Sequence, residues 1–273
     1  MTLTSGFLPT DHPALQPMNA RDAMKFGFYQ SLRTLTQGLS PASLTAHEFK
    51  VFSQNGEDGV TLEILRRIGV VHEFFVEFGG GPGLENNTRV LTDLLGWRGV
   101  LMECDDVTFE LLRRSLGGRE EQVAVRQERV TPDNVEDLLR RNGVPADLDV
   151  LSIDVDGIDY YIWEALEAFT PRLVVIEYNG SLPDTPLVQP SDGPAWQGTS
   201  FFGASLEALI QLGRRKGYTL AHTELTGLNA FFVRDDLFER LGPLQVPKRP
   251  MNLNLRIGGH PDDLDGRSYL VPD

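Results

Sequence analysis

Two pairs of oxygen-bearing side chains have a spacing that could serve catalysis. Asp154 and Asp156 lie two residues apart in "SIDVDG", and Glu177 and Asn179 lie two residues apart in "IEYNG". Alternate residues of a strand face the same side, so each pair can point into one site if these segments are strands. Carboxylate and amide oxygens can bind a hard cation such as Mg²⁺, and carboxylates can take a proton from a substrate.

Two functional interpretations of these residues compete. In the first, Asp154, Asp156, Glu177 and Asn179 bind Mg²⁺, which would hold a substrate hydroxyl and lower its pKa. In the second there is no metal: Asp154 positions part of a bound ligand, Glu177 is a base or binds the substrate, and Asp156 caps the next helix. A purely structural interpretation makes Asp156-Gly157 only a turn. Asp154 and Glu177 are therefore our first catalytic candidates.

A glycine-rich loop follows a short apolar segment in "HEFFVEFGGGPGLENNT", residues 72–88. Gly79, Gly81 and Gly83 do not fit the Gly-x-Gly-x-x-Gly pattern of dinucleotide sites, and no Gly-Lys-Ser/Thr follows as in a Walker A loop. Glu85, at the start of the next helical pattern, is a poor neighbour for a pyrophosphate at a helix N-terminus. The loop therefore favours a ligand without phosphate.

Acids on both sides of this loop indicate which ligand. Glu77 lies two residues before Gly79 and suits an ammonium group, and Asn87 follows the loop. Glu103 ends the next apolar segment, where an acid typically accepts hydrogen bonds from ribose hydroxyls. A ligand with a ribose, an amino-acid part and no phosphate meets these conditions, and S-adenosylmethionine is such a ligand.

The polar motif "SQNGEDG", residues 53–59, precedes the glycine loop. It could simply begin a helix, with Ser53 or Asn55 as cap and acids in the first turn. In the functional interpretation, Gln54 and Asn55 lie over the cofactor. Glu57 or Asp58 then contacts the ammonium group or the substrate, so Asp58 is our third catalytic candidate.

Strand and helix patterns alternate from residue 53 onward. Five strand–helix units imply a mostly parallel sheet covered on both faces, and a final closely spaced strand pair implies an antiparallel hairpin. The third of these helices should begin after Thr131 as N-cap, with Pro132 in its first turn. The expected strands cover residues 74–78, 98–104, 122–130, 149–155, 172–178, 218–225 and 229–235.

The expected organisation has three parts. Residues 1–50 form a helical extension, 51–240 the α/β domain, and 241–273 a tail that packs on the core or on a second copy in a homodimer. Within the domain, the loop Gly180–Ser205 is long enough to be a functional lid. We expect it to close over the substrate with Trp196, Phe201 and Phe202.

Composition excludes several classes of function. The chain has 273 residues, 41% of them hydrophobic, and a net charge of -14, which argues against nucleic acid as a partner. The single cysteine, Cys104, excludes an intrachain disulfide and is expected to be a buried hydrophobe. There is no secretory signal pattern and no apolar run of about 20 residues. We therefore expect a cytoplasmic protein with a small-molecule substrate and no membrane partner.

Four of these features together resemble class I S-adenosylmethionine-dependent methyltransferases: "VEFGGGPG", "LMECD", "LSIDVDG" and the terminal hairpin. "SQNGEDG" with "IDVDG" resembles the FkbM-like branch, many of whose members act on natural products or sugars. The resemblance implies a Rossmann-like methyltransferase sandwich of seven strands, with S-adenosylmethionine bound by Glu77, Gly79, Gly81 and Glu103. It also implies methyl transfer to a small molecule, most readily at oxygen and with Mg²⁺ as an optional aid.

Two alternatives to a methyltransferase remain open from the sequence. One is a binding module that keeps the fold and holds the cofactor without chemistry. The other is an NAD-dependent oxidoreductase, which would use the same kind of sheet for a different nucleotide.

Overall fold

The structure is a computed structural model that describes residues 43–193, 196–244, 246 and 261–272. Most of the expected helical extension, residues 1–50, and much of the tail lie outside these residues. Among the described residues, no helix is long and apolar enough to cross a membrane.

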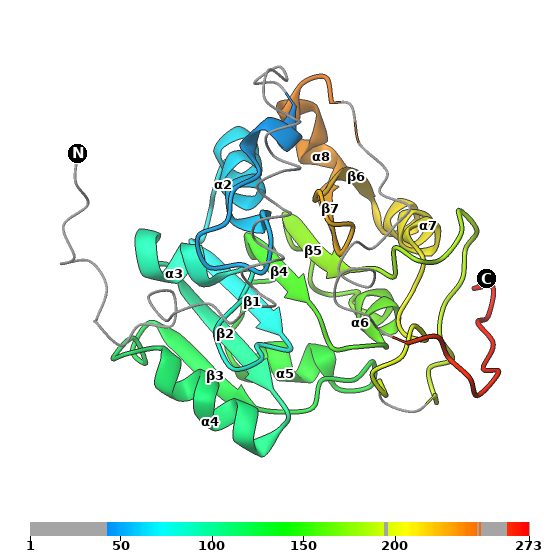
Figure 1. Ribbon diagram of the computed structural model, residues 1–273. Coiled ribbons are helices and arrows are strands. Elements are labelled where there is room, and N and C mark those ends of the chain that lie inside the picture. Colours follow the sequence, from blue (N-terminus) through cyan, green and yellow to red (C-terminus); the bar gives the residue numbers. More distant parts are fainter. Residues whose placement is uncertain (1–42, 194–195, 245, 247–260, 273) are drawn as a thin grey trace.

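A seven-stranded sheet forms the centre of the molecule, in the order β3-β2-β1-β4-β5-β7-β6 (Figure 1). Six strands run in one direction, and β7 alone runs in the other, pairing antiparallel with both β5 and β6. The sequence predicted a Rossmann-like sandwich with a seven-stranded, mostly parallel sheet and a terminal antiparallel hairpin, so the predicted fold class is confirmed. The strands are β1 Phe74–Phe78, β2 Arg98–Glu103, β3 Val123–Gln127, β4 Val150–Ile153, β5 Leu173–Glu177, β6 Tyr218–Thr223 and β7 Asn229–Arg234.

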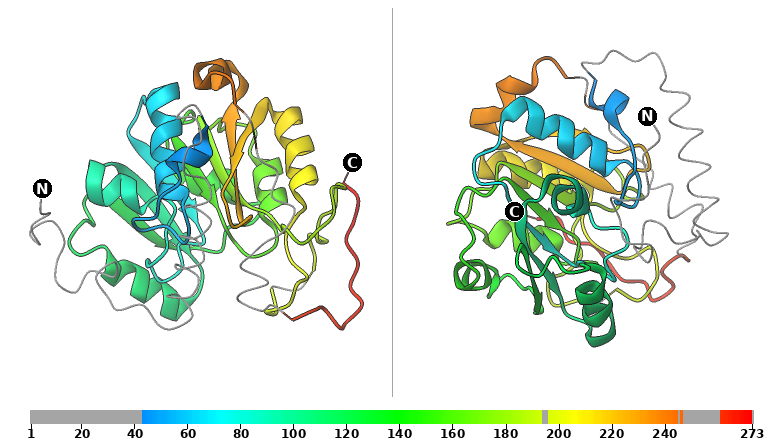
Figure 2. Two further views of the ribbon diagram at one scale, coloured as in Figure 1. Left: turned by 45° about the horizontal axis from the view of Figure 1, so that its top comes forward. Right: turned by 90° about the vertical axis from the view of Figure 1, so that its left-hand side faces the viewer.

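Helices cover both faces of the sheet, because both faces are apolar along the buried strands (Figures 1 and 2). One hydrophobic core includes side chains of α2, α3, α4 and α8, and the other includes side chains of α5, α6 and α7. The helices are α2 Glu57–Ile68, α3 Arg89–Leu95, α4 Asp106–Ser115, α5 Val135–Arg141, α6 Asp159–Ala165, α7 Leu206–Lys216 and α8 Asp235–Phe238, with short 3₁₀ helices η2 Leu44–His47 and η3 Glu239–Leu241.

Local sequence signals position both ends of α7. In α7, the Ser205 side chain accepts a hydrogen bond from the Ala208 N–H, and the left-handed Gly217 ends the helix. The prediction for α5 was wrong by one turn: the helix begins at Val135 rather than after Thr131. The Asn134 side chain accepts from the Thr131 N–H, so residues 131–134 form a separate turn before the helix.

Candidate active site

A cavity of about 1010 Å³ opens at the carboxyl ends of the parallel strands. This edge is where open α/β sheets bind ligands. Its wall is strongly acidic, because eight of the lining residues are acids and Arg129 is the one basic residue among the described lining residues. The acids are Glu77, Glu85, Glu103, Asp105, Glu128, Asp154, Asp156 and Glu177.

Sheet register brings three predicted residues together. In the parallel pairing of β4 with β5, Ile153 lies opposite Ile176, so Asp154 follows one strand where Glu177 ends the other. Carboxylate oxygens of Asp154, Asp156 and Glu177 all lie within 4.8 Å of one another. We call these three residues the carboxylate trio. Such a group can share a proton or hold a divalent cation.

The electrostatics of the trio favour proton uptake. Burial, and then the negative charges of neighbouring acids, raise the pKa values of Asp154 and Glu177 well above the usual range. The same causes raise the pKa of Asp156 to about 6. Carboxylates this close cannot all ionise at low cost, so the trio has at least one group that changes protonation near neutral pH.

A strained turn holds Asp156 in the trio. Its φ of 58° is in the left-handed region, which residues other than glycine rarely adopt. The turn is tied by Asp159, whose carboxylate accepts hydrogen bonds from the Val155 and Gly157 N–H groups at 2.8 and 2.9 Å. The capping role suggested for Asp156 is wrong, because Ile158 is at the N-cap of α6 and no side chain caps this helix, so the Asp156 carboxylate is left at the cavity.

The glycine loop lies directly against the end of β4. Gly79 has a φ of 73°, and a Cβ there would lie 1.6 Å from the Asp154 carbonyl oxygen. Only glycine fits at this crossing, which keeps the loop next to the trio. Gly79, Gly81 and Asn87, which the sequence indicated as cofactor-binding residues, all line the cavity.

Glu77 lines the cavity and also organises the start of α3. Its carboxylate is buried and accepts hydrogen bonds from the Asn87 N–H at 2.9 Å and from the Thr88 N–H at 3.2 Å. Burial raises the pKa of Glu77. The neighbouring Asn86 is buried too, and its Oδ1 has no hydrogen-bond partner among the described residues. Asn86 also lines the cavity, and the sequence pattern did not single it out.

Glu103 ends β2 and braces the glycine loop. Its Oε2 accepts from the Gly81 N–H at 3.0 Å, and its Oε1 accepts from the Cys104 and Asp105 N–H groups at 2.7 and 2.9 Å. A carboxylate has about four acceptor positions, so three are used and about one is free for a ligand hydroxyl. Cys104, expected to be buried, is exposed and lines the cavity because the strand ends one residue earlier.

The motif "SQNGEDG" contributes one residue to the cavity. Gln54 lines the wall, and its backbone oxygen accepts from Lys50, which also pairs with Glu85 at 3.3 Å. Asn55 and Asp58 are buried and are not among the lining residues. The structure thus separates the motif into a cavity-facing and a structural part.

Asp58 has a structural place rather than the catalytic one assigned from the sequence. Its Oδ2 accepts hydrogen bonds from the Val51, Phe52 and Ser53 N–H groups and from the Ser53 hydroxyl. This carboxylate shapes the segment before α2. Burial, its largest influence, raises the pKa of Asp58 to about 6.

Asn179 is not among the lining residues of the cavity and its side-chain amide is hydrogen-bonded to other groups, which removes it from the four-residue metal set. Beyond Glu177 the chain leaves β5, so the alternation expected of a strand no longer applies, and the Asn179 N–H binds the Ala204 carbonyl. The Asn179 Nδ2 donates to carbonyl oxygens of the 180–205 loop, and its Oδ1 accepts from the Ser181 N–H.

The 180–205 loop supplies part of the cavity wall. Trp196 and Phe202 line it, together with Gln189, Ser191 and Gly193. Phe201, grouped with them from the sequence, is buried and packs behind the wall. Gln189 and Thr108 are also wall residues, and nothing in their local sequence patterns marks them.

Comparisons with known proteins show similarity at the level of shape alone. No protein-family model matches the sequence, and no curated protein matches it. A precorrin-6y C5,15-methyltransferase from Geobacter metallireducens has 16% identity over 68% of this chain and 93% of that chain, with a TM-score of 0.43. An O-methyltransferase from Bacillus cereus has 16% identity over 80% of this chain and 91% of that chain, with a TM-score of 0.42. These low scores carry no argument about activity, and the fold rests on the strand order.

Proposed function

We propose that the protein is an S-adenosylmethionine-dependent methyltransferase that methylates a small molecule at oxygen. The observation that carries the proposal is the acidic cavity at the carboxyl edge of the sheet, with eight acids and Arg129 among its lining residues. S-adenosylmethionine carries a sulfonium and an ammonium cation and has no phosphate, so it complements this wall. A dinucleotide pyrophosphate would face repulsion here.

The residues of the cavity divide into three parts in this proposal. Glu77 and Asn86 Oδ1 receive the ammonium group, Gly79 and Gly81 let the amino-acid part approach the backbone, and the free acceptor position of Glu103 receives a ribose hydroxyl. Bound S-adenosylmethionine supplies the activated methyl group. The chain itself orients the two reactants, because in-line displacement needs the nucleophile about 3–3.5 Å from the methyl carbon.

The carboxylate trio would remove the proton of the acceptor. A hydroxyl must lose its proton to become a strong nucleophile, whereas a neutral amine already has a free lone pair. A group of acids with raised pKa values beside the cavity therefore supports a hydroxyl acceptor. The motifs "SQNGEDG" and "IDVDG" extend the proposal to the FkbM-like branch, and so to a natural product or sugar.

Asp154, Asp156 and Glu177 also fit a divalent cation, since their oxygens lie within 4.8 Å of one another. A cation there would lower the pKa of the acceptor hydroxyl. Metal analysis of the purified protein, followed by turnover of the methyl donor with EDTA and with added Mg²⁺, tests this part. Full turnover in EDTA would rule out the metal.

Calorimetry with S-adenosylhomocysteine and with NAD tests the proposed cofactor. We expect binding of S-adenosylhomocysteine and no detectable binding of NAD. Binding of NAD without binding of S-adenosylhomocysteine would overturn the proposal in favour of an oxidoreductase.

A further inference from the structure

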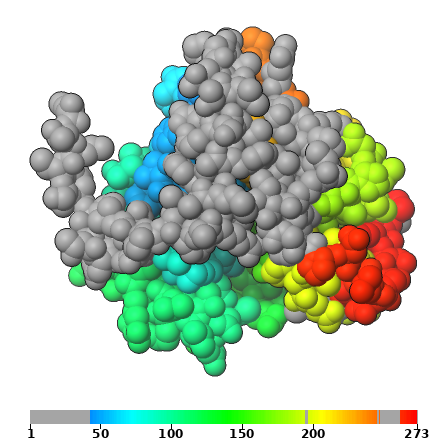
Figure 3. Space-filling view, in the orientation of Figure 1, coloured from blue at the N-terminus to red at the C-terminus, as the bar shows by residue number. Residues whose placement is uncertain are grey.

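Residues 261–272, here called the C-terminal segment, lie against the 180–205 loop on the surface of the molecule (Figure 3, red against yellow). We propose that this segment fastens the loop as the acceptor-side wall of the cavity, and that Tyr269 is the positioning residue at the centre of the contact. The assignment of this loop to the acceptor side rests on the proposed function, whereas its attachment to the C-terminal segment does not.

The loop brings the aromatic surface of the cavity. Trp196 and Phe202 are the aromatic side chains among the described lining residues, and every acid of the wall comes from elsewhere in the chain. The loop also begins just after Glu177 of the trio. An acceptor placed between the trio and the methyl donor would therefore touch this loop, while the ribose and amino-acid parts would touch the glycine loop and Glu103.

Backbone hydrogen bonds tie the C-terminal segment to the loop at two points. Val188 and Leu270 exchange a pair of N–H to carbonyl bonds of 2.8 Å each, and Val188 also bridges Ala204. Farther along, the Ser200 N–H donates to the Pro261 carbonyl at 2.9 Å. The segment thus adds an extended edge to the loop, as a strand adds to a sheet.

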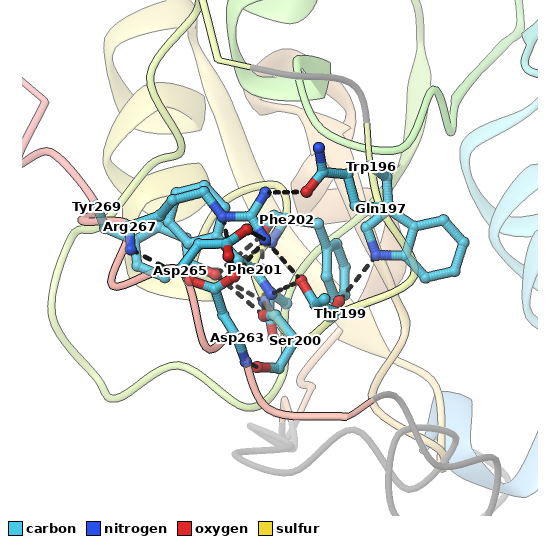
Figure 4. A network of polar contacts seen from close by, with 11 residues as sticks. Trp196, Gln197, Thr199, Ser200, Phe201, Phe202, Asp263, Asp265, Arg267 and Tyr269 are labelled. Atoms are coloured by element: carbon cyan, nitrogen blue, oxygen red, sulfur yellow. Dashed lines mark hydrogen bonds and ion pairs between the residues drawn. The ribbon is translucent and has the colours of Figure 1, made fainter.

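Side chains of the C-terminal segment also contact the loop between Gln197 and Phe201 (Figure 4). The Arg267 guanidinium lies 4.8 Å from the centre of the Phe201 ring and donates to Gln197 Oε1 and Thr199 Oγ1 at 3.0 and 3.1 Å. Asp263 holds the guanidinium from the other side through an ion pair. A charge that is paired, hydrogen-bonded and stacked on a ring is well fixed in place.

Tyr269 joins the segment, the loop and the exit of β5 at one atom. Its hydroxyl accepts from the Phe202 N–H and from Asn179 Nδ2, both at 3.2 Å, and donates to the Ser200 carbonyl at 3.2 Å. Its ring packs 4.6 Å from that of Phe201. The hydroxyl therefore connects the residue two places after Glu177 to the backbone of the cavity-lining Phe202.

Removing this hydroxyl isolates its contribution. Tyr269→Phe keeps the ring but leaves the Phe202 N–H without its acceptor. Tyr218→Phe is the matched control, because the Tyr218 hydroxyl also donates to a backbone carbonyl, Pro171 at 2.7 Å, and Tyr218 does not line the cavity. Hydrogen exchange followed by mass spectrometry would measure the exchange rates of the backbone amides of residues 185–204. The measurement would be made on both variants and on a truncated protein that ends at residue 260.

We expect these amides to exchange about tenfold faster in Tyr269→Phe and faster still in the shortened form, with no change in Tyr218→Phe. Acrylamide quenching gives a spectroscopic check, since Trp97 and Trp163 are buried and Trp196 is half-buried. Quenching should rise in Tyr269→Phe. Exchange and quenching equal to those of the wild type would overturn the fastening role.

Calorimetry with S-adenosylhomocysteine on the same proteins separates this inference from the proposed function. Equal affinity in the wild type and Tyr269→Phe, together with faster exchange, supports a loop on the acceptor side. An affinity that falls in parallel with faster exchange would place the loop on the cofactor side and overturn that assignment. Absence of binding even in the wild type would refute the proposed cofactor, whereas hydrogen exchange would still decide the fastening role.

Discussion

The position of the Asp156 carboxylate is unfavourable for the stability of the fold. Its backbone is left-handed, and Asp154 and Glu177 bring two more acids within 4.8 Å of it. Strain and like charges both lower stability, and such unfavourable features persist mainly at functional sites. At the residue scale, the trio is therefore the strongest sign that this edge of the sheet does chemistry.

Asp156→Asn should therefore stabilise the protein at pH 8. Asparagine tolerates the left-handed backbone, and the substitution removes one charge from the trio. We expect Tm to rise by roughly 1–3 °C, a modest value because the Asp156 side chain is exposed to solvent. Since burial and neighbouring acids raise the pKa of Asp156 to about 6, the wild-type residue is largely protonated at pH 5, and the gain should disappear there.

Thermal unfolding at both pH values measures this difference. Asp133→Asn, at an exposed acid with no hydrogen bond to its side chain described, is the control and should change little. A Tm at pH 8 that stays equal or falls in Asp156→Asn would contradict the account of the trio.

At the scale of elements, the site depends on how closely β1 and β4 end. The turn after β1 crosses the Asp154 carbonyl at Gly79 with no room for a side chain. The two ends are also joined by the hydrogen bond from the Asp154 N–H to the Phe78 carbonyl, 3.2 Å long. This contact places the glycine loop and the trio around one cavity, so a small change here should disturb both.

Gly79→Ala and Gly96→Ala form a matched pair that tests the crossing. Both glycines have a similar positive φ, 73° and 71°, but a Cβ at Gly96 would meet nothing within 4 Å. Gly96→Ala should lower the free energy of unfolding by about 1–2 kcal/mol, the usual penalty for that backbone. Gly79→Ala should lower it by at least about 4 kcal/mol or prevent folding, since backbone atoms must move. Urea unfolding would measure both values. Similar losses of unfolding free energy in the two variants would contradict a close crossing at Gly79.

At the scale of the whole molecule, buried acids with raised pKa values lower the stability of the fold when they ionise. Besides the trio, burial raises the pKa of Glu224 to about 8 and that of Asp58 to about 6. Acids with lowered pKa values, such as Glu63 at about 2 through its hydrogen bonds to Arg66 and Arg67, complete their titration at lower pH. Above about pH 5 the raised groups therefore dominate, and the folded chain holds more protons than the unfolded chain.

Stability should accordingly fall as pH rises from 5.5 to 8.5. A raised carboxyl pKa stabilises the folded state below the ordinary pKa, and this contribution is lost as pH rises through the folded value, here about 6 for Asp58 and about 8 for Glu224. We expect a loss of at least about 1 kcal/mol in the free energy of unfolding. Urea unfolding curves measured across this range decide the matter, and stability that is constant or rises would contradict the assignment.

The sequence was sufficient for the fold and for part of the site. Alternating strand and helix patterns predicted every strand and the antiparallel end, because these depend on local periodicity. Asp154, Asp156 and Glu177 were found because parallel register brings strand ends together. The prediction for Asn179 was wrong because β5 ends at Glu177. The prediction for Asp58 was wrong because this buried carboxylate accepts hydrogen bonds from backbone N–H groups. Local sequence patterns reveal neither the end of the strand nor these hydrogen bonds. The grip of Tyr269 on the loop depends on contacts between distant segments, which periodicity does not reveal.

The most direct test of the central claim is the coupling between Glu103 and the ribose of the cofactor. Calorimetry would measure S-adenosylhomocysteine and an analogue without ribose hydroxyls on the wild type, on Glu103→Gln, and on Glu121→Gln as an exposed control with the same charge change. The account predicts that the wild type and Glu121→Gln lose about tenfold or more in affinity for the analogue, whereas Glu103→Gln binds both ligands equally weakly. If Glu103→Gln only damaged the glycine loop, it would lower the affinity for both ligands by the same factor. The same preference for S-adenosylhomocysteine in Glu103→Gln as in the wild type would contradict the account.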